Sequence, residues 1–374
     1  MSVTRRERDG GHVTWVARWL AEGRHHSRSF QRKADAVAFE REVRRQAQLG
    51  AHAPGVPSRD ALVEWLRTWW ARDSGAWARS TRSVHGRVLD RWVVPYLGAV
   101  QLRHLGPARV RDWRAEIQAA GCPPNTVNSA MSVLSAALGA AVRDGLLPAN
   151  PCSGIRRLPH QVARPHALAP LEVERIRAAM PTMRDVVLVG LLAYAGLRPE
   201  EALALTWGSV GRTLVIDAAY TYGERKPTKT HQRRSVEVIP PLARDLALLR
   251  PWRAEPDALV AAHDRGGHLD LDVWRRGVWR PAATAAGVKA TPYDGRHTYA
   301  SLLIHEGRSP LLVSAALGHA SGELVWRRYA HVFEEARLAP SVTMVDAIEA
   351  ARAELERAGL RPGCAQEAVR VLRS

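Results

Sequence analysis

Apolar residues recur at two different periods near the N-terminus of this chain. Val13, Trp15 and Ala17 occupy alternate positions, and a second short stretch at residues 27–31 follows a turn-like glycine. Residues 34–48 then carry apolar side chains three to four positions apart. Alternation predicts β-strands, and spacing of three to four predicts a helix. Residues 1–50 are therefore expected to form a small β-sheet packed by one helix.

Residues 58–147 show helical spacing throughout. Ser58 or Asp60 is a suitable N-cap for a first helix, and Asn125 or Thr126 for the last. Three later helices are expected at Arg79–Tyr96, Arg109–Ala119 and Asn125–Asp144. Four tryptophans fall at positions expected to be in the helical core: Trp65, Trp69, Trp92 and Trp113.

From about residue 168 the pattern becomes mixed. An apolar run at 186–194 is followed by helical spacing at 199–206, and residues 213–218 and 235–239 alternate like strands. A basic connection containing glycine and proline joins these two stretches, and helical spacing returns from residue 241. This part of the chain is expected to be mainly helical with a small antiparallel sheet.

Two proline-bearing stretches without periodicity, at 51–57 and 158–170, are expected to be linkers. These linkers divide the chain into separate domains, and the whole is expected to be a multidomain α+β protein. The expected parts are a sheet-plus-helix domain, an all-helical domain, a mainly helical domain with a small sheet, and a C-terminal tail. Their ranges are 1–50, 58–150, 168–345 and 346–374.

The chain of 374 residues carries 54 basic and 37 acidic side chains, a net charge of +17. Such an excess favours polyanionic partners, nucleic acid first and an anionic membrane surface second. No apolar run approaches the roughly 18–20 residues of a membrane span, and the N-terminus lacks the apolar stretch of a secretory signal. Three widely separated cysteines form no CxxC pair, so neither a disulfide framework nor a zinc site is expected. A cytoplasmic protein that binds nucleic acid is the resulting expectation.

Polar residues in apolar settings mark four segments of the third domain. Arg198 stands at the start of the helical pattern at 199–206, with Glu201 three positions later, where the two side chains can face each other. Lys226 and Lys229, two of only four lysines, lie in the predicted hairpin. Unlike arginine, lysine can lose its proton. The other two segments are Thr291–Thr298 and Leu317–His331.

Together these segments resemble the catalytic domain of the tyrosine recombinase (phage integrase) family. That family's pattern is an arginine with a glutamate three later, a hairpin lysine, His-x-x-Arg, Leu-Gly-His, and a tyrosine near ten residues further on. The matching residues, in order, are Arg198, Glu201, Lys229, Arg296, His319 and Tyr329. Residues 58–150 resemble the family's helical core-type DNA-binding domain, and residues 1–50 resemble its arm-type DNA-binding domain.

The resemblance implies a site-specific recombinase that cuts and rejoins DNA through a covalent 3′-phosphotyrosine, and so integrates or excises a mobile element. Tyr329 would be the nucleophile, Arg198 and Arg296 would bind the phosphate, and Lys229 would protonate the leaving oxygen. His319 would donate a hydrogen bond to a non-bridging oxygen. Neither ATP, a metal nor another cofactor would be required, because the phosphotyrosine keeps the phosphodiester energy.

One position departs from the family pattern. Tyr293 stands where the first histidine of His-x-x-Arg is usual. A phenol is a poor base near neutral pH, since its ordinary pKa is about 10. The identity of the proton acceptor for the nucleophile is therefore open at the Tyr293 position, with His319 or a water as the substitute.

The resemblance also implies partners and leaves alternatives. Double-stranded DNA at attachment sites and a homotetramer in the synapse are expected, with a directionality factor or a DNA-bending host protein as further partners. Apolar positions at helical spacing from Val345 to Ala358 predict a short helix that contacts a neighbouring protomer. The alternatives are packing of this helix on its own domain, a resolvase-type recombinase of a plasmid or conjugative transposon, and an integrase-fold DNA-binding regulator without catalysis.

Overall fold

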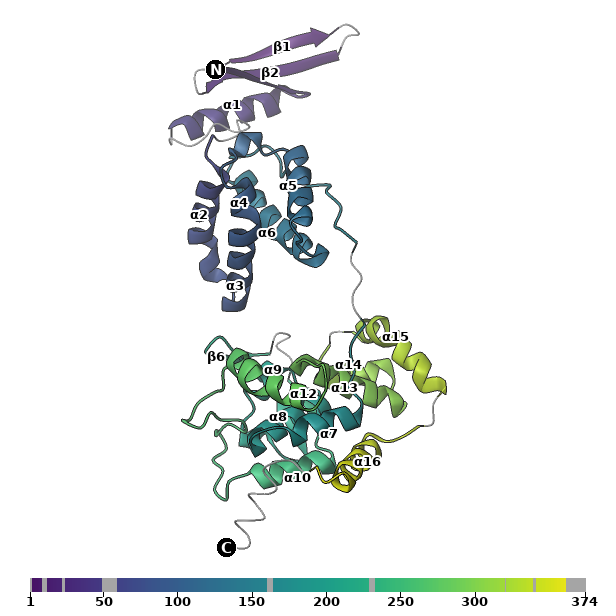
Figure 1. Cartoon of the computed structure of the whole chain (residues 1–374). Coiled ribbons are helices and arrows are strands. Elements are labelled where there is room, and N and C mark those ends of the chain that lie inside the picture. The colour runs from purple at the N-terminus through teal and green to yellow at the C-terminus, as the bar shows by residue number, and fades with distance from the viewer. Residues whose placement is uncertain are drawn as a thin grey trace. The chain divides into compact units, whose positions relative to one another are not determined.

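The computed structural model describes residues 2–8, 12–21, 24–48, 59–159, 164–228, 233–319, 321–338 and 341–360. The chain divides into two compact units, Met1–Gln161 and Val162–Ser374. Their elements are mostly helices, with small antiparallel sheets that include a three-stranded sheet near the N-terminus (Figure 1). The expectation of a mainly helical protein with small sheets is therefore confirmed.

The first unit begins with an antiparallel sheet in the order β1-β2-β3, packed by one helix. The bounds are β1 (Ser2–Arg8), β2 (His12–Ala21), β3 (Arg24–Phe30) and α1 (Lys33–Gln48). Trp19 of β2 and Val43 of α1 are buried, and Phe39 packs against them. The alternation did not predict β1, because this strand is polar apart from Val3 and gains its order by pairing with β2.

The rest of this unit is helical. Its elements are α2 (Leu62–Asp73), η1 (Ser74–Ala76), α3 (Arg79–Val88), η2 (Leu89–Val93), α4 (Val94–Leu97), η3 (Leu102–His104), α5 (Pro107–Ala119) and α6 (Pro124–Arg143). Trp65, Trp69 and Trp113 are buried in its core, and Trp92 packs against that core while partly exposed. These helices thus pack around the tryptophans expected from their spacing.

Two details of the helical expectation were wrong. Helix α6 begins at Pro124 after Pro123, so neither Asn125 nor Thr126 is its cap; likewise Ala61 rather than Asp60 precedes α2, and Ser58 lies outside the described residues. The continuous helix expected at 79–96 is interrupted by the π-helical turn η2. Pro95 supplies the reason, since its ring clashes with the carbonyl four residues earlier and a wider turn relieves that clash.

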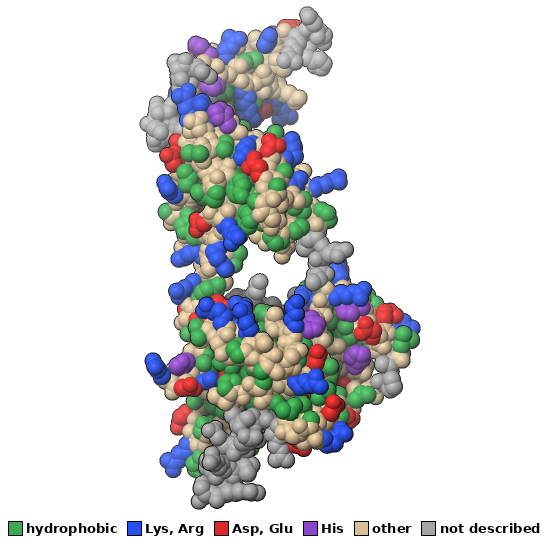
Figure 2. Space-filling view, viewed as in Figure 1, with side chains coloured by type: hydrophobic (Ala, Val, Ile, Leu, Met, Phe, Trp, Pro, Cys, Tyr) green, Lys and Arg blue, Asp and Glu red, His purple; other side chains and the backbone are tan. Residues whose placement is uncertain are grey.

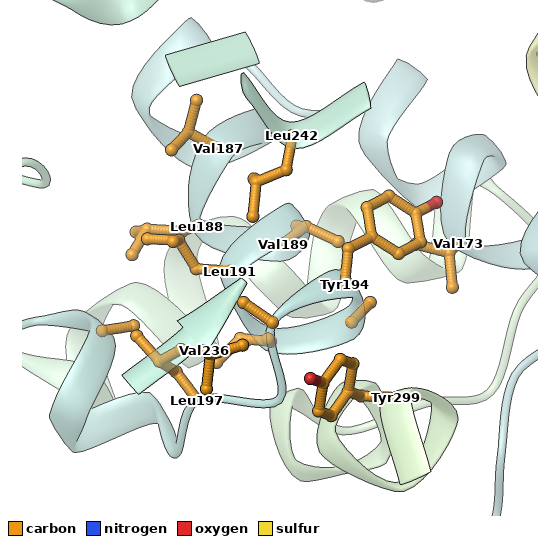
Figure 3. Close-up of a cluster of buried hydrophobic side chains, with 14 of the residues drawn as sticks. Val173, Val187, Leu188, Val189, Leu191, Tyr194, Leu197, Val236, Leu242 and Tyr299 are labelled. Atoms are coloured by element: carbon orange, nitrogen blue, oxygen red, sulfur yellow. The ribbon is translucent and has the colours of Figure 1, made fainter. Parts of the chain in front are cut away.

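The second unit packs its elements around the buried helix α8 (Met183–Tyr194) (Figure 3). The other helices are α7 (Pro170–Ala178), α9 (Pro199–Ala202), η4 (Trp207–Ser209), α10 (Pro240–Leu249), α11 (Leu271–Trp274), η5 (Arg275–Trp279), α12 (Arg280–Ala285), α13 (Pro292–His305), α14 (Pro310–Leu317), α15 (Gly322–Leu338) and α16 (Met344–Arg357). Leu191, Tyr194 and Leu197 lie in this core beside Tyr299 of α13.

Four short strands form two antiparallel pairs: β4 (Thr213–Ile216) with β7 (Arg234–Glu237), and β5 (Ala218–Thr221) with β6 (Glu224–Pro227). Tyr222 and Gly223 both have positive φ, as a two-residue hairpin turn between β5 and β6 requires. The helix expected at 199–206 ends at Ala202 instead. Its continuation is prevented because the backbone of Leu205 and Trp207 hydrogen-bonds to residues 258–260.

Helix α16 packs on α7 and α10 of its own unit. Its apolar stripe is buried there, including Ile348, Ala351 and Leu355. This packing matches the alternative in which the helix packs on its own domain, and contact with a neighbouring protomer stays a prediction. Residues 361–374 of the predicted tail lie outside the described residues.

A buried network of ion pairs fixes α16 in place. Arg177 of α7 donates to Glu174 and to Asp245 of α10, both at 2.5 Å. Arg352 of α16 donates to the same two carboxylates, at 3.3 and 2.8 Å. We call these four residues the Glu174 cluster; two cations and two anions balance within it.

Among the described residues, no helix is long and apolar enough to cross a membrane. Lys and Arg side chains gather along one edge of the second unit in the space-filling view (Figure 2). They also occur on the visible face of the first unit.

Candidate active site

A sharp turn after α8 positions Arg198. Gly196 has φ +64°, and a Cβ there would lie 2.2 Å from the ring of Tyr299, so only glycine fits. Arg198 then precedes the first turn of α9 as its N-cap. Its backbone N–H donates to Oε2 of Glu201 at 2.8 Å, and its Nη1 donates to Oε1 at 2.7 Å. The pair predicted from the spacing of three is therefore formed.

Glu201 also binds an arginine that the spacing did not predict. Arg234 of β7 donates from Nη1 to Oε1 at 2.9 Å and from Nη2 to Oε2 at 2.6 Å, a two-pronged pairing. Its Nε donates to the carbonyl of Ala316 at 3.1 Å, which ties β7 to the end of α14. Burial alone would raise the pKa of Glu201, but Arg234 and Arg198 lower it to about 2. Glu201 is thus a permanent anion at physiological pH.

Arg296 completes the group around Glu201. Gly295 lets α13 approach α8, since a Cβ there would lie 2.9 Å from Leu192. The Arg296 guanidinium is almost fully buried, donates to the carbonyls of Gly196 (2.6 Å) and Leu317, and lies 4.0 Å from Glu201. We call Arg198, Arg234, Arg296 and Glu201 the Glu201 cluster. Burial lowers the pKa of Arg296 to about 9, and the nearby charges of Arg198 and Arg234 add to this effect.

His319 follows α14, where Gly318 adopts a positive φ of 65° as the C-cap. The His319 Nε2 atom lies 3.3 Å from Nη2 of Arg296. Burial and the positive charges of Arg296 and Arg198 lower the pKa of His319 to about 4, so its ring is neutral at pH 7. Because a guanidinium only donates, Nε2 accepts and the ring proton belongs on Nδ1. That Nδ1 is buried with no partner among the described residues.

Tyr329 lies in α15 at a kink, where its φ and ψ are −116° and 16°. The side chain is 1% exposed, and its hydroxyl lies 2.6 Å from Nδ1 of His297, the residue after Arg296. Burial raises the pKa of Tyr329 to about 12, although Arg328 and Arg296 act in the opposite direction. Tyr329 is therefore a neutral phenol beside the Glu201 cluster.

Tyr293 lies at the edge of the Glu201 cluster, near enough for the charges of Arg198 and Arg296 to act on its hydroxyl. The Tyr293 hydroxyl is 3.4 Å from Oε2 of Glu200, and burial and that carboxylate raise the pKa of Tyr293. Lys229 lies outside the described residues, while Lys226 of β6 pairs with Glu224 at 2.5 Å. The structure thus brings together Arg198, Glu201, Arg296 and His319, with Tyr329 close by.

Sequence reasoning missed two residues of this site, Arg234 and His297. Arg234 lies in a basic stretch whose neighbours are equally polar, so no local signal distinguishes it. His297 directly follows Arg296, the arginine of the family motif, and this position next to a site residue is the signal that could have predicted it.

A sequence model of the phage integrase family matches residues 166–336. This match supports the tyrosine recombinase resemblance for that region of the chain. The match contains every residue of the Glu201 cluster as well as His297, His319 and Tyr329.

Curated integrases are similar to this chain over two thirds or more of their own length. The ICEBs1 integrase of Bacillus subtilis is 22% identical over 66% of this chain and 72% of its own length. The integrase of Mycobacterium phage D29 is 26% identical over 71% and 73%, and a prophage phiRv2 integrase of Mycobacterium tuberculosis is 26% identical over 81% and 84%. The chain is accordingly a site-specific recombinase, an enzyme that cuts and rejoins DNA.

Solved integrase structures share its fold. The Tn1549 transposon integrase in complex with a circular intermediate DNA aligns with a TM-score of 0.61 at 17% identity, over 79% of this chain and 99% of that chain. A lambda integrase dimer bound to a COC′ core site aligns with a TM-score of 0.61 at 15% identity, over 91% and 97%.

Proposed function

We propose that Tyr329 is the nucleophile of this recombinase and that the Glu201 cluster binds the scissile phosphate, so that the enzyme integrates or excises a mobile element. The observation that carries the proposal is the charge of the cluster. Three buried or half-buried guanidinium groups surround one carboxylate. Buried charges are stable when they are paired, and a phosphodiester would supply one of the two missing negative charges.

Arg198 and Arg296 have the chemistry to stabilise the transition state. Phosphoryl transfer spreads negative charge over the non-bridging oxygens, and fixed cations aimed at those oxygens lower the barrier. Glu201 holds Arg198 in place, and the carbonyls of Gly196 and Leu317 hold Arg296. We assign to His319 the hydrogen bond to a non-bridging oxygen that the sequence predicts.

The reaction proposed for these residues conserves the phosphodiester energy. The Tyr329 oxygen bonds to phosphorus while the bond from phosphorus to the 5′-oxygen breaks, which leaves a 3′-phosphotyrosine and a 5′-hydroxyl. Lys229 would give the leaving oxygen its proton. Attack of a 5′-hydroxyl from the exchanged strand then releases Tyr329 and rejoins the DNA.

The first unit would hold the DNA. We assign residues 58–150 to the core-type sites and residues 1–50 to arm-type sites, and four protomers to the synapse because four strands are exchanged. Lambda integrase, which shares the fold, has been solved as a dimer on a core site and as a tetramer on a Holliday junction. The names of the relatives, integrases of phages and a prophage, support a mobile element as the substrate.

The decisive experiment compares the wild-type protein with Tyr329→Phe on a nicked suicide duplex spanning the junction between the element and its host chromosome. We expect a denaturation-resistant protein–DNA adduct for the wild type and none for the variant. DNA affinity should stay within a few-fold, because it comes mostly from many phosphate contacts. An adduct in the Phe variant would show that another residue is the nucleophile, whereas no adduct in either protein would favour the non-catalytic regulator.

A truncation tests the assignment of the domains. Residues 1–57 hold eleven basic side chains, and each phosphate contact contributes about 0.9 to the slope of log affinity against log salt. Removing them should lower that slope and abolish binding to arm-type sites while core binding persists. Equal loss of core binding would show that the domain assignment is mistaken.

A further inference from the structure

We infer that His297 is the catalytic proton acceptor for Tyr329. This inference rests on the proposed function, since it takes Tyr329 as the nucleophile. The Nδ1 atom of His297 lies 2.6 Å from the Tyr329 hydroxyl oxygen, within the range of a strong hydrogen bond. A proton acceptor must lie within this reach of the proton it removes.

The fold holds the two side chains together from different helices. His297 belongs to α13 and directly follows Arg296, while Tyr329 lies at the kink of α15, and α13 packs against α15. Their rings are tilted at 56° with centroids 5.9 Å apart. Tyr329 is almost fully buried, and a buried hydroxyl needs an acceptor for its proton. Within the described part of the chain, Nδ1 of His297 is the partner that its hydroxyl has.

A second contact of His297 competes with Tyr329 for the choice of the ring nitrogen that carries the proton. Nε2 lies 3.4 Å from Nη2 of Arg328, which can only donate. If Nε2 accepted that bond, Nδ1 would carry the ring proton and the Tyr329 hydroxyl proton would lack an acceptor. The bond to Tyr329 is the shorter by 0.8 Å, and Arg328 is exposed and can turn toward water. The hydroxyl of Tyr329 therefore donates to Nδ1.

The charges around His297 keep the proton on Tyr329 until DNA arrives. Arg328 of α15, Asp294 and Arg296 of α13, and His166 before α7 surround the ring. Burial lowers the pKa of His297 to about 4, with Arg328 adding to the effect. A phosphodiester at Arg198 and Arg296 would add negative charge and so raise the proton affinity of the imidazole. Proton transfer is thereby linked to the presence of substrate.

The proposed step moves one proton from Tyr329 to His297. As the Tyr329 oxygen bonds to phosphorus, its proton passes to Nδ1 and the bond to the 5′-oxygen breaks, with that oxygen protonated by the general acid. In the rejoining step the 5′-hydroxyl attacks and returns its proton to the general acid, while Tyr329 recovers its proton from His297. The histidine usual in the family is Tyr293 here, whose hydroxyl contacts Glu200 instead. His297 thus supplies an imidazole that position 293 lacks.

The test measures single-turnover adduct formation on the suicide duplex against pH, for His297→Ala and His297→Asn, with His305→Asn of the same helix as the matched control. Both His297 variants should lose about 10²–10³-fold at pH 7. Their rates should rise about tenfold per pH unit where the wild type is flat, and added imidazole should restore part of the Ala variant's rate. The control should match the wild type.

Three outcomes separate the alternatives. Wild-type rates in both His297 variants would overturn the inference, and so would a pH-independent loss without imidazole rescue, which would indicate a structural role. The His297→Asn variant keeps a hydrogen-bond acceptor at this position, and its DNA affinity shows whether it is folded. The test can therefore be made with His297→Asn even if the Ala variant misfolds. An adduct formed by Tyr329→Phe would instead overturn the proposed function itself. A 5′-sulfur leaving group should rescue Lys229→Ala and leave the His297 variants slow, because their defect is at the nucleophile.

Discussion

Two clusters of buried and half-buried arginines lie in the same unit and differ in charge balance. The Glu174 cluster pairs Arg177 and Arg352 with Glu174 and Asp245, so its charges cancel. The Glu201 cluster places three arginines around one carboxylate. Each cluster joins elements that are far apart in the sequence, yet only in the Glu174 cluster do the charges balance without a ligand.

The pKa values of Arg177 and Arg296, the most buried arginine of each cluster, differ in the same sense. Burial alone would lower the pKa of Arg177, but Glu174 and Asp245 raise it above its ordinary value. In the Glu201 cluster, burial lowers the pKa of Arg296 to about 9 and its cationic neighbours reinforce the decrease. The comparison teaches that a balanced buried network serves the fold, whereas an excess of one sign marks a place where an ion of the other sign binds.

The largest contrast should come from the same substitution in the two clusters. Arg296→Lys should lower the rate of adduct formation by about 10²–10³-fold, because a point charge cannot reproduce the planar fork of the guanidinium. Arg352→Lys should leave that rate within a few-fold. Single-turnover cleavage on the suicide duplex measures both, and a near-normal rate for Arg296→Lys would remove Arg296 from the phosphate site.

A substitution in the balanced cluster should act on stability instead. Arg177→Met leaves two buried carboxylates facing Arg352 alone, which should cost about 3–5 kcal/mol of the free energy of unfolding. Hydrogen exchange of the α8 amides in the full chain measures this loss. If exchange is unchanged while cleavage falls, the division of roles between the clusters is incorrect.

The effect of acid on the stability of the protein follows from the lowered pKa of Glu201. Because the folded pKa of Glu201 is lowered to about 2, its contribution of roughly 3 kcal/mol is complete above pH 4.5 and disappears as the pH falls through 2. Glu201→Gln should therefore be less stable than the wild type at pH 6, with a gap that narrows toward pH 2. Hydrogen exchange measures both proteins across this pH range. A difference in stability that stayed constant with pH would contradict the lowered pKa of Glu201.

The smallest effect should be binding of a simple anion. Sulfate at ten times its Kd should stabilise the protein by about 1.4 kcal/mol, seen as a higher Tm than in chloride of equal ionic strength. Arg198→Ala should lose the increment and Arg352→Lys should keep it. An equal increment in all three proteins would mean that sulfate acts on the whole surface rather than in the Glu201 cluster.

Much of the fold could be predicted because helical periodicity is local. The spacing of apolar residues predicted α1, α5, α6 and the buried run of α8. It failed where the backbone responds to distant partners, as at β1, which pairs with β2, and at residues 203–206, which bond to the segment at 258–260. The π-helical turn before Pro95 shows that a single proline changes a helix that the spacing describes as continuous.

By itself, the sequence predicted most of the helices and singled out Arg198, Glu201, Arg296, His319 and Tyr329, because each of these residues lies in a short local motif. Only the tertiary structure decided that Arg234 meets Glu201 across 33 residues and that His297 meets Tyr329 across 32. It also decided that α16 packs on its own unit through Arg352. Each of these contacts joins elements that are separate in the chain, and burial sets its energy. No local pattern encodes either the pairing or the burial.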